Sequence, residues 1–190
     1  ELAKKIKEKY PECIIVFGGW QAPMSDRSQN FFKEHPYVDI IAHGEGEIIF
    51  GNILMENLKD KPDWSRIKGC SLPYRLITGD AASSNVQNGL KIIDQKVKFN
   101  PDPLDTFVTE PQPRIDDLMT MPSPYLNGLF DELISDPECV YDLEATIETT
   151  RGCPYACTYC EIGTKYYQKI NFHTLEKIYS ENRISRKASL

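Results

Sequence analysis

Three cysteines near the end of the chain have a spacing that suits metal chemistry. Cys153, Cys157 and Cys160 form a C-x3-C-x2-C pattern directly after a stretch rich in β-branched residues. This spacing allows one tight loop to point three thiolates at a common centre. An iron–sulfur cube held by protein alone takes four cysteines, so three leave one iron open to an outside ligand. The pattern therefore predicts a four-iron, four-sulfur (4Fe-4S) cluster that a substrate or cofactor completes.

Three other roles for these cysteines are open to comparison. A structural zinc site needs four closed ligands, and the nearest candidates for a fourth, His173 and Cys139, give no familiar finger spacing. A disulfide framework requires an oxidising compartment, and the sequence has no secretory signature. Buried cysteines that only pack would not need this spacing. We interpret Cys139 as structural.

The residues around the cysteines resemble the signature of the radical S-adenosylmethionine (SAM) superfamily, CxxxCxΦC with an aromatic residue at Φ. Tyr159 occupies the Φ position, and Arg151, Gly152 and Pro154 also match the way that signature is commonly written. The resemblance implies that the three cysteines hold the 4Fe-4S cluster and that SAM chelates its open iron. It also implies that Tyr159 lies near the adenine of SAM.

The same resemblance implies a reaction and its partners. In that superfamily the reduced cluster passes one electron to SAM, and the resulting 5′-deoxyadenosyl radical takes a hydrogen atom from a small-molecule substrate. The electron would come from a reductant such as flavodoxin or ferredoxin. The strand expected over residues 145–150 would be the first strand of a partial (βα) barrel. A non-catalytic iron–sulfur electron carrier, or a metal-stabilised binding module, is the alternative from another functional class.

Residues 1–60 alternate between amphipathic and continuously apolar stretches. The alternation predicts helix, strand, helix, strand, helix with short connections, which is typical of an open doubly wound α/β sheet. Cys13 is expected in the core of its strand, because small thiols usually behave as apolar residues. The residues expected to define the elements are Ala3, Ile6 and Tyr10, then Cys13–Phe17, then Phe31 and Phe32, then Val38–Ala42, and finally Phe50, Ile53, Leu54 and Leu58.

Glycines follow both expected strands, where α/β sheets bind their ligands. Gly18 and Gly19 end the first strand, and Gly44 and Gly46 follow the second. Tight turns are the simpler interpretation of these glycines. The pair Gly44-x-Gly46 is no dinucleotide fingerprint, because Ile49 takes the place of the third glycine.

Upstream of CxxxCxxC, this arrangement resembles the C-terminal half of the cobalamin-binding domain in B12-type radical SAM enzymes. The resemblance implies that Gly18, Gly19 and Gly46 face cobalamin. It implies a methyltransferase that transfers a methyl group from cobalamin to an unactivated carbon. No D-x-H-x-x-G loop is present, so a relative that keeps the domain without binding cobalamin is the alternative.

The whole chain is therefore predicted to be α/β, with three parts. Residues 1–60 would form a partial Rossmann-like domain of the cobalamin-binding type. Residues 61–140 would form a β-rich and Pro-rich linker, with Cys70 in a small sheet of its own and Asn88-Gly89 as a hairpin turn. Residues 141–190 would begin the radical SAM barrel. Both ends of the chain look truncated, so we expect the chain to be a piece of a larger enzyme and to be inactive alone.

Composition excludes several partners. The formal net charge is -6 and no block of lysine or arginine is present, which argues against nucleic-acid binding. No apolar run is long enough to span a bilayer, so no membrane partner is expected. The absence of a signal peptide indicates the cytoplasm. His35 is interpreted as a helix-end residue, His43 as a structural histidine, and His173 lies outside the cysteine spacing, so none of them is a candidate site residue.

Overall fold

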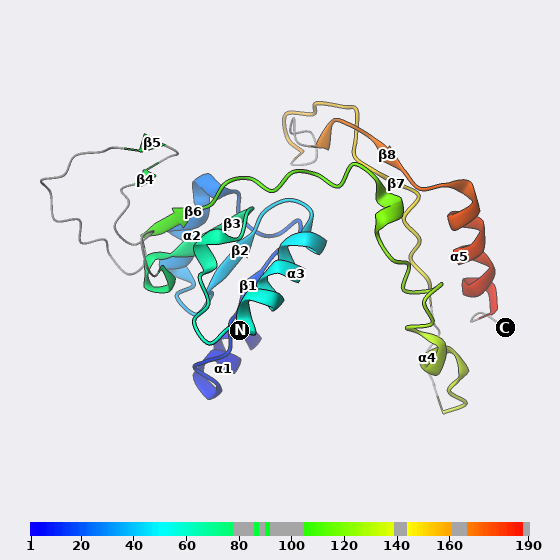
Figure 1. The fold of residues 1–190 in the computed structure, drawn as a ribbon, viewed down its shortest axis with the longest axis horizontal. Helices are drawn as coiled ribbons and strands as arrows, with labels where there is room; N and C mark the ends of the chain where they lie inside the picture. Colours follow the sequence, from blue (N-terminus) through cyan, green and yellow to red (C-terminus); the bar gives the residue numbers. More distant parts are fainter. Residues whose placement is uncertain (78–85, 88–89, 92–104, 139–143, 161–166, 188–190) are drawn as a thin grey trace, which may run out of the picture. The chain divides into compact units, whose positions relative to one another are not determined.

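The computed structural model describes residues 1–77, 86–87, 90–91, 105–138, 144–160 and 167–187 (Figure 1). The chain divides into two compact units, Glu1–Arg114 (unit 1) and Ile115–Leu190 (unit 2). Each unit is described by itself below. The boundary between the units, after Arg114, differs from the two boundaries that the sequence suggests, after residues 60 and 140.

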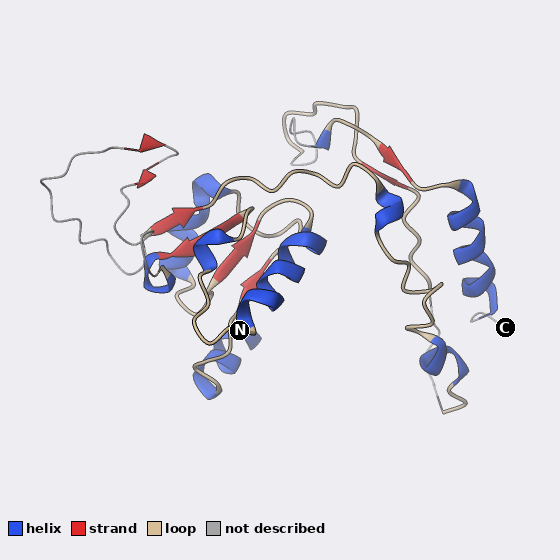
Figure 2. Cartoon of the chain, viewed as in Figure 1, coloured by secondary structure: helices blue, strands red, loops and turns tan. Residues whose placement is uncertain are grey.

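Unit 1 is built on a four-stranded mixed sheet in the order β1-β2-β3-β6 (Figure 2). The strands are β1 (Val16–Phe17), β2 (Ile40–Ala42), β3 (Cys70–Pro73) and β6 (Thr106–Val108). Strands β1 and β2 run parallel, with Val16 opposite Ile40. Strand β3 is antiparallel to β2, and β6 is antiparallel to β3. The parallel pair joined through a helix is the connection that the sequence predicts.

Helices pack against both faces of this sheet. They are α1 (Leu2–Lys9), α2 (Ser28–Glu34) and α3 (Gly46–Asn57), with 3₁₀ turns η1 (Ser25–Arg27), η2 (Trp64–Arg66) and η3 (Tyr74–Leu76). Successive strand residues point to opposite faces. Ile40 accordingly packs in the cluster that contains Ile49 and Ile53 of α3, whereas Ile41 packs in the cluster that contains Phe32 of α2. The α/β class is confirmed.

A buried carboxylate ties the first elements of unit 1 together. The side chain of Asp39, 2% exposed, accepts hydrogen bonds at 2.8 Å from the backbone N–H of Ile15 and from Nζ of Lys7. Nη2 of Arg75 donates to it from 3.1 Å. Because a buried charge is tolerated only when it is paired and hydrogen-bonded, these partners allow Asp39 to lie just before β2.

Two predictions about packing in unit 1 are wrong. Cys13 is exposed, because β1 begins only at Val16 and Cys13 lies in the turn after α1, where its N–H donates to the carbonyl of Tyr10. The predicted core residues Phe50 and Leu54 of α3, and Leu58 just after it, are exposed, and only Ile53 of that set is buried. This helix is apolar on nearly every side, so the sequence pattern does not select which side faces the sheet.

The strand around Cys70 also differs from expectation. It was expected in a small separate sheet, but Cys70 pairs with Ala42, so β3 extends the main sheet. The free edge of β2 offers unpaired backbone groups, which favours the addition of a strand there. Strands β4 (Val86–Gln87) and β5 (Leu90–Lys91) are antiparallel, as the hairpin prediction requires. The predicted turn at residues 88–89 lies outside the described residues.

Unit 2 contains few regular elements. They are η5 (Leu118–Thr120), α4 (Asp131–Ser135), β7 (Thr150–Arg151), β8 (Asn171–Phe172) and α5 (Leu175–Lys187). Strands β7 and β8 are antiparallel. Oγ1 of Thr174 accepts the N–H of Lys177 at 3.3 Å and so caps the first turn of α5. No helix in the described part of the chain is long and apolar enough to cross a membrane.

The strand predicted over residues 145–150 is largely absent from unit 2. Only Thr150 of that range belongs to β7, because its partner β8 is itself two residues long. One further bond, from the N–H of His173 to the carbonyl of Thr149, continues the pairing. A strand this short gives no test of the predicted barrel.

Candidate functional site

The cysteine loop, residues 152–170, connects β7 to β8 in unit 2. The N–H of Cys153 donates to the carbonyl of Tyr167 at 2.9 Å, which closes the base of the loop. The N–H of Cys160 donates to the carbonyl of Cys157 at 3.2 Å, so the last two cysteines lie on one turn. The structure thus holds the two ends of the cysteine loop together across an antiparallel strand pair.

Gly152 is required at the start of the cysteine loop. Its φ of 120° lies in a region that residues with a side chain rarely adopt. A Cβ at this position would also collide with the carbonyl oxygen of Lys169 and lie 2.9 Å from that of Tyr167. The signature glycine therefore permits the two backbone segments at the base of the loop to approach each other.

The three predicted cluster ligands are free thiols. Cys157 is exposed, and Cys153 and Cys160 are partly exposed. Tyr159 between them is 90% exposed. No three Cys, His, Asp or Glu side chains among the described residues lie in positions that would hold a metal ion. The donor types fit an iron–sulfur cluster because thiolates are its usual ligands, although the sulfurs do not converge in this structure.

Cys70 differs from the cysteines of the loop in its chemistry. Burial raises the pKa of the Cys70 thiol to about 12, so it stays protonated and packs as a core residue. This supports its structural interpretation. Cys139 lies outside the described residues.

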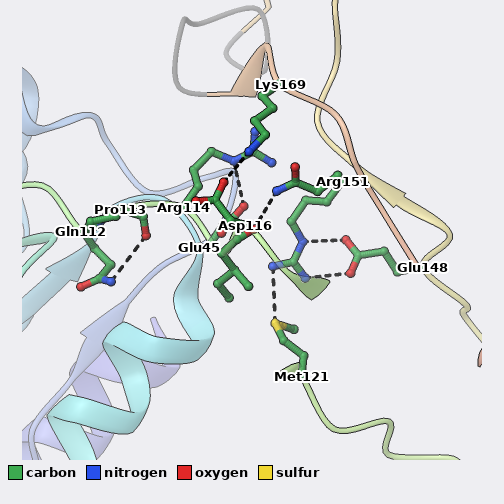
Figure 3. Close-up of polar contacts among 11 residues, drawn as sticks. Glu45, Gln112, Pro113, Arg114, Asp116, Met121, Glu148, Arg151 and Lys169 are labelled. Carbon is green, nitrogen blue, oxygen red and sulfur yellow. Dashed lines mark hydrogen bonds and ion pairs between the residues drawn. The ribbon is translucent and has the colours of Figure 1, made fainter. Parts of the chain in front are cut away.

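A charged cluster lies at the strand that leads into the cysteine loop (Figure 3). Nε and Nη2 of Arg151 donate to the two carboxylate oxygens of Glu148 at 2.8 and 2.7 Å. Nε2 of His173 lies 3.6 Å from the same carboxylate. Hydrogen bonding from Arg151 lowers the pKa of the Glu148 carboxyl, against the opposing effect of burial. The carboxylate is therefore held in its charged form.

Sequence reasoning identified this cluster only in part. Arg151 belongs to the signature around the cysteines, whereas no sequence pattern marks Glu148 or His173. In extended chain, residues three apart point to opposite faces, so the spacing of Glu148 and Arg151 gives no periodic signal. The structure shows these two side chains joined by a forked ion pair.

The second candidate site is the ligand edge of unit 1, where β1 and β2 end. Gly18 lies beside Ala42, since a Cβ on it would be 3.7 Å from the Cβ of Ala42. Gly19 has φ 79°, and a Cβ there or at Gly46 would meet nothing within 4 Å. The structure therefore brings Gly18 next to the end of β2 and leaves open space beside Gly19 and Gly46, but it shows no contact that assigns them to cobalamin.

Polar side chains of the ligand edge are engaged within unit 1. Nε2 of His43 lies 2.7 Å from Oγ of Ser71, and burial lowers the pKa of His43. Nε of Arg114 donates to Oε1 of Glu45 at 3.0 Å, with both side chains nearly buried (Figure 3). The carboxylate between the two glycines is thus occupied by an ion pair.

Comparison with known proteins identifies two relatives. The chain is 36% identical over 166 residues to the cobalamin-dependent radical SAM methyltransferase TokK of Streptomyces tokunonensis, a match that covers 86% of this chain and 20% of the relative. It is 32% identical over 183 residues to a 2-(S-pantetheinyl)-carbapenam-3-carboxylate methyltransferase of Streptantibioticus cattleyicolor, covering 95% and 22% respectively. The chain spans about a fifth of the length of these relatives. No protein-family model matches it.

Proposed function

Because this chain is a homologue of a cobalamin-dependent radical SAM methyltransferase, we propose that it supplies the cluster-binding loop of such an enzyme. Cys153, Cys157 and Cys160 hold a 4Fe-4S cluster, and SAM binds the remaining iron. The observation that carries this proposal is the C-x3-C-x2-C pattern within a loop that is closed at its base by Cys153 and Tyr167. When bound, the reduced cluster supplies the electron that breaks a C–S bond of SAM.

The residues of the chain bind and orient these groups. Gly152 lets the loop fold back on itself, and the hydrogen bond from Cys153 fixes the first ligand against the opposite strand. Tyr159, exposed on the loop, has an aromatic surface available for the adenine of SAM. Thiolate ligation requires reduced cysteines, which favours the cytoplasm as the working compartment.

The ligand edge of unit 1 is proposed to bind cobalamin. Gly18, Gly19 and Gly46 allow a large ligand to approach the backbone, and two of these glycines face open space. Together with the names of the two relatives, this supports methyl transfer to an unactivated carbon of a small-molecule substrate. The electron would come from flavodoxin or ferredoxin. The relatives are more than four times as long, so we expect no turnover by residues 1–190 alone.

Anaerobic reconstitution with iron and sulfide tests the cluster. The chain should bind about four irons, the complement of one cube, and give an electron paramagnetic resonance (EPR) signal on reduction. Addition of SAM should change that signal, because SAM ligates the open iron. Cys153→Ser, Cys157→Ser and Cys160→Ser should each abolish normal loading, while Cys13→Ser, which changes an exposed cysteine in unit 1, should not.

Other outcomes would replace the proposal. Tightly bound zinc or a disulfide between loop cysteines would exclude the cluster. A cluster whose EPR signal does not respond to SAM would indicate an electron carrier. For unit 1, the absence of a corrin absorption band after incubation with cobalamin would indicate a radical SAM relative that does not bind it.

A further inference from the structure

We propose that Glu148, Arg151 and His173 form a positioning cluster that sets the backbone leading into Cys153, so that the first ligand reaches the iron–sulfur cluster correctly. The inference rests on the proposed function, because it assumes that Cys153 is a ligand. None of the three side chains is assigned a contact with the cluster, SAM or substrate. They act through the backbone, two residues before the first cysteine.

The strongest contact in the positioning cluster is the forked ion pair. Arg151 uses two N–H groups on the two oxygens of Glu148, at 2.8 and 2.7 Å, and a bidentate pair of this kind restricts orientation as well as distance. The Arg151 side chain is only 15% exposed, and its Nη1 lies 3.9 Å from Sδ of Met121 on another segment of unit 2. The guanidinium is therefore contacted from two segments of unit 2.

His173 follows β8 directly, and its imidazole restricts where the carboxylate of Glu148 can lie. Its side chain is 4% exposed, and its backbone N–H donates to the carbonyl of Thr149, next to Glu148 in the chain. Among the described atoms Nδ1 has no hydrogen-bond partner, and Nε2 lies 3.6 Å from Glu148. A buried imidazole whose polar contact is this carboxylate couples the end of β8 to the start of β7.

The backbone at Arg151 transmits this arrangement to the loop. Arg151 pairs with Asn171 across the strands, and Nδ2 of Asn171 donates to the carbonyl of Ile115 at 2.7 Å. Gly152 follows with its special φ, and Cys153 then closes the loop base. Rotation of the Arg151 backbone would therefore displace the Cys153 thiol directly, since a single residue separates them.

A nearby ion pair provides a matched control. Nζ of Lys169 lies 2.6 Å from a carboxylate oxygen of Asp116, closer than either hydrogen bond from Arg151 to Glu148, but the two side chains are 66% and 78% exposed. Exposed pairs of this kind contribute little to structure. Asp116→Asn therefore removes a short but exposed ion pair of the same unit, while the contacts among Glu148, Arg151 and His173 remain.

The experiment compares reconstituted chains 1–190 with Glu148→Gln, Arg151→Lys, Arg151→Met, His173→Gln or Asp116→Asn. Changes in residues that orient metal ligands typically weaken metal binding about ten-fold or more. We expect a loss of that order for Glu148→Gln and Arg151→Met, together with a changed EPR spectrum of the cluster that remains. Arg151→Lys keeps the positive charge but cannot form the bidentate pair with Glu148. It should bind more iron than Arg151→Met and less than the unmodified chain, with an intermediate EPR spectrum. His173→Gln should have a smaller effect of the same kind, and Asp116→Asn none.

The outcomes separate this inference from the proposed function. If the unmodified chain binds no cluster, both are overturned. If it binds a cluster and Glu148→Gln and Arg151→Met give the same iron content and EPR spectrum, only the positioning role is overturned. Far-ultraviolet circular dichroism and protease resistance of each variant before reconstitution identify unfolding. A variant that loses cluster only because unit 2 has unfolded, with no partial recovery in Arg151→Lys, also counts against the positioning role.

Discussion

The two units of this chain are stabilised in different ways. Unit 1 has an apolar core on both faces of its sheet, with Phe32, Ile40, Ile41 and Leu72 fully buried. In unit 2 the buried apolar residues, within the described ranges, are Ile115 and Leu118. Its other tightly buried side chains are polar and include Asn171 and His173. Unit 1 is organised by burial, and unit 2 by hydrogen bonds around the cysteine loop.

This difference indicates which interactions stabilise each unit. Burial of apolar surface is the dominant favourable term in folding, and unit 1 has it without a ligand. Unit 2 has little of it, so metal binding can contribute to its folding, as in small metal-dependent domains. The comparison makes three predictions, in order of expected effect.

The largest effect should follow Leu72→Ala in the core of unit 1. Removal of a buried leucine typically costs about 2–5 kcal/mol of unfolding free energy. Both tryptophans of the chain, Trp20 and Trp64, belong to unit 1, so their fluorescence during urea denaturation reports on this unit. Leu118→Ala, the matched change in unit 2, should leave that transition unchanged. A similar shift from both variants would mean that the two units do not unfold separately.

A smaller effect, confined to unit 2, should follow Gly152→Ala. The forced φ and the collision with Lys169 should cost about 1–3 kcal/mol, the usual range for local backbone strain. Iron bound after reconstitution should fall, while tryptophan fluorescence of unit 1 stays unchanged. Gly46→Ala is the control, because a Cβ there meets nothing within 4 Å and its φ is ordinary. Equal iron loading in Gly152→Ala and the unmodified chain would contradict the role assigned to this glycine.

The smallest effect should be a pH dependence of unit 1 that comes from His43. Burial lowers the pKa of His43 in the folded chain, so the unfolded chain takes up the proton first as the pH falls. Unfolding free energy should therefore decrease when the pH falls through about 6.5, the ordinary histidine value. Urea denaturation at about pH 7.5 and 5.5, monitored by tryptophan fluorescence, measures this change. His43→Gln should make the two values more alike, and an unchanged difference would assign the effect to other groups.

Local sequence patterns predict those features of the chain that a single periodicity or a single motif determines. The order of helices and strands through α3 follows from alternating apolar stretches. The radical SAM resemblance rests on a short signature, and the relative TokK is named as a radical SAM enzyme. The cluster ligands and the cobalamin contacts remain predictions.

Other features depend on contacts between distant residues, which single-sequence patterns do not contain. The pairing of β3 with β2 depends on which free edge is available, not on the residues near Cys70 alone. The apolar residues of α3 surround the helix, so its buried side follows from the sheet. The contact between Glu148 and His173 joins residues on either side of the whole cysteine loop.

The ion pair between Glu45 and Arg114 changes how the ligand edge would receive phosphate. Two glutamates near the glycines, Glu45 and Glu47, give this turn an acidic sequence that should repel a phosphodiester. Arg114 offsets one of those negative charges at 3.0 Å. The electrostatic barrier to a nucleotide tail is therefore lower than the sequence alone suggests.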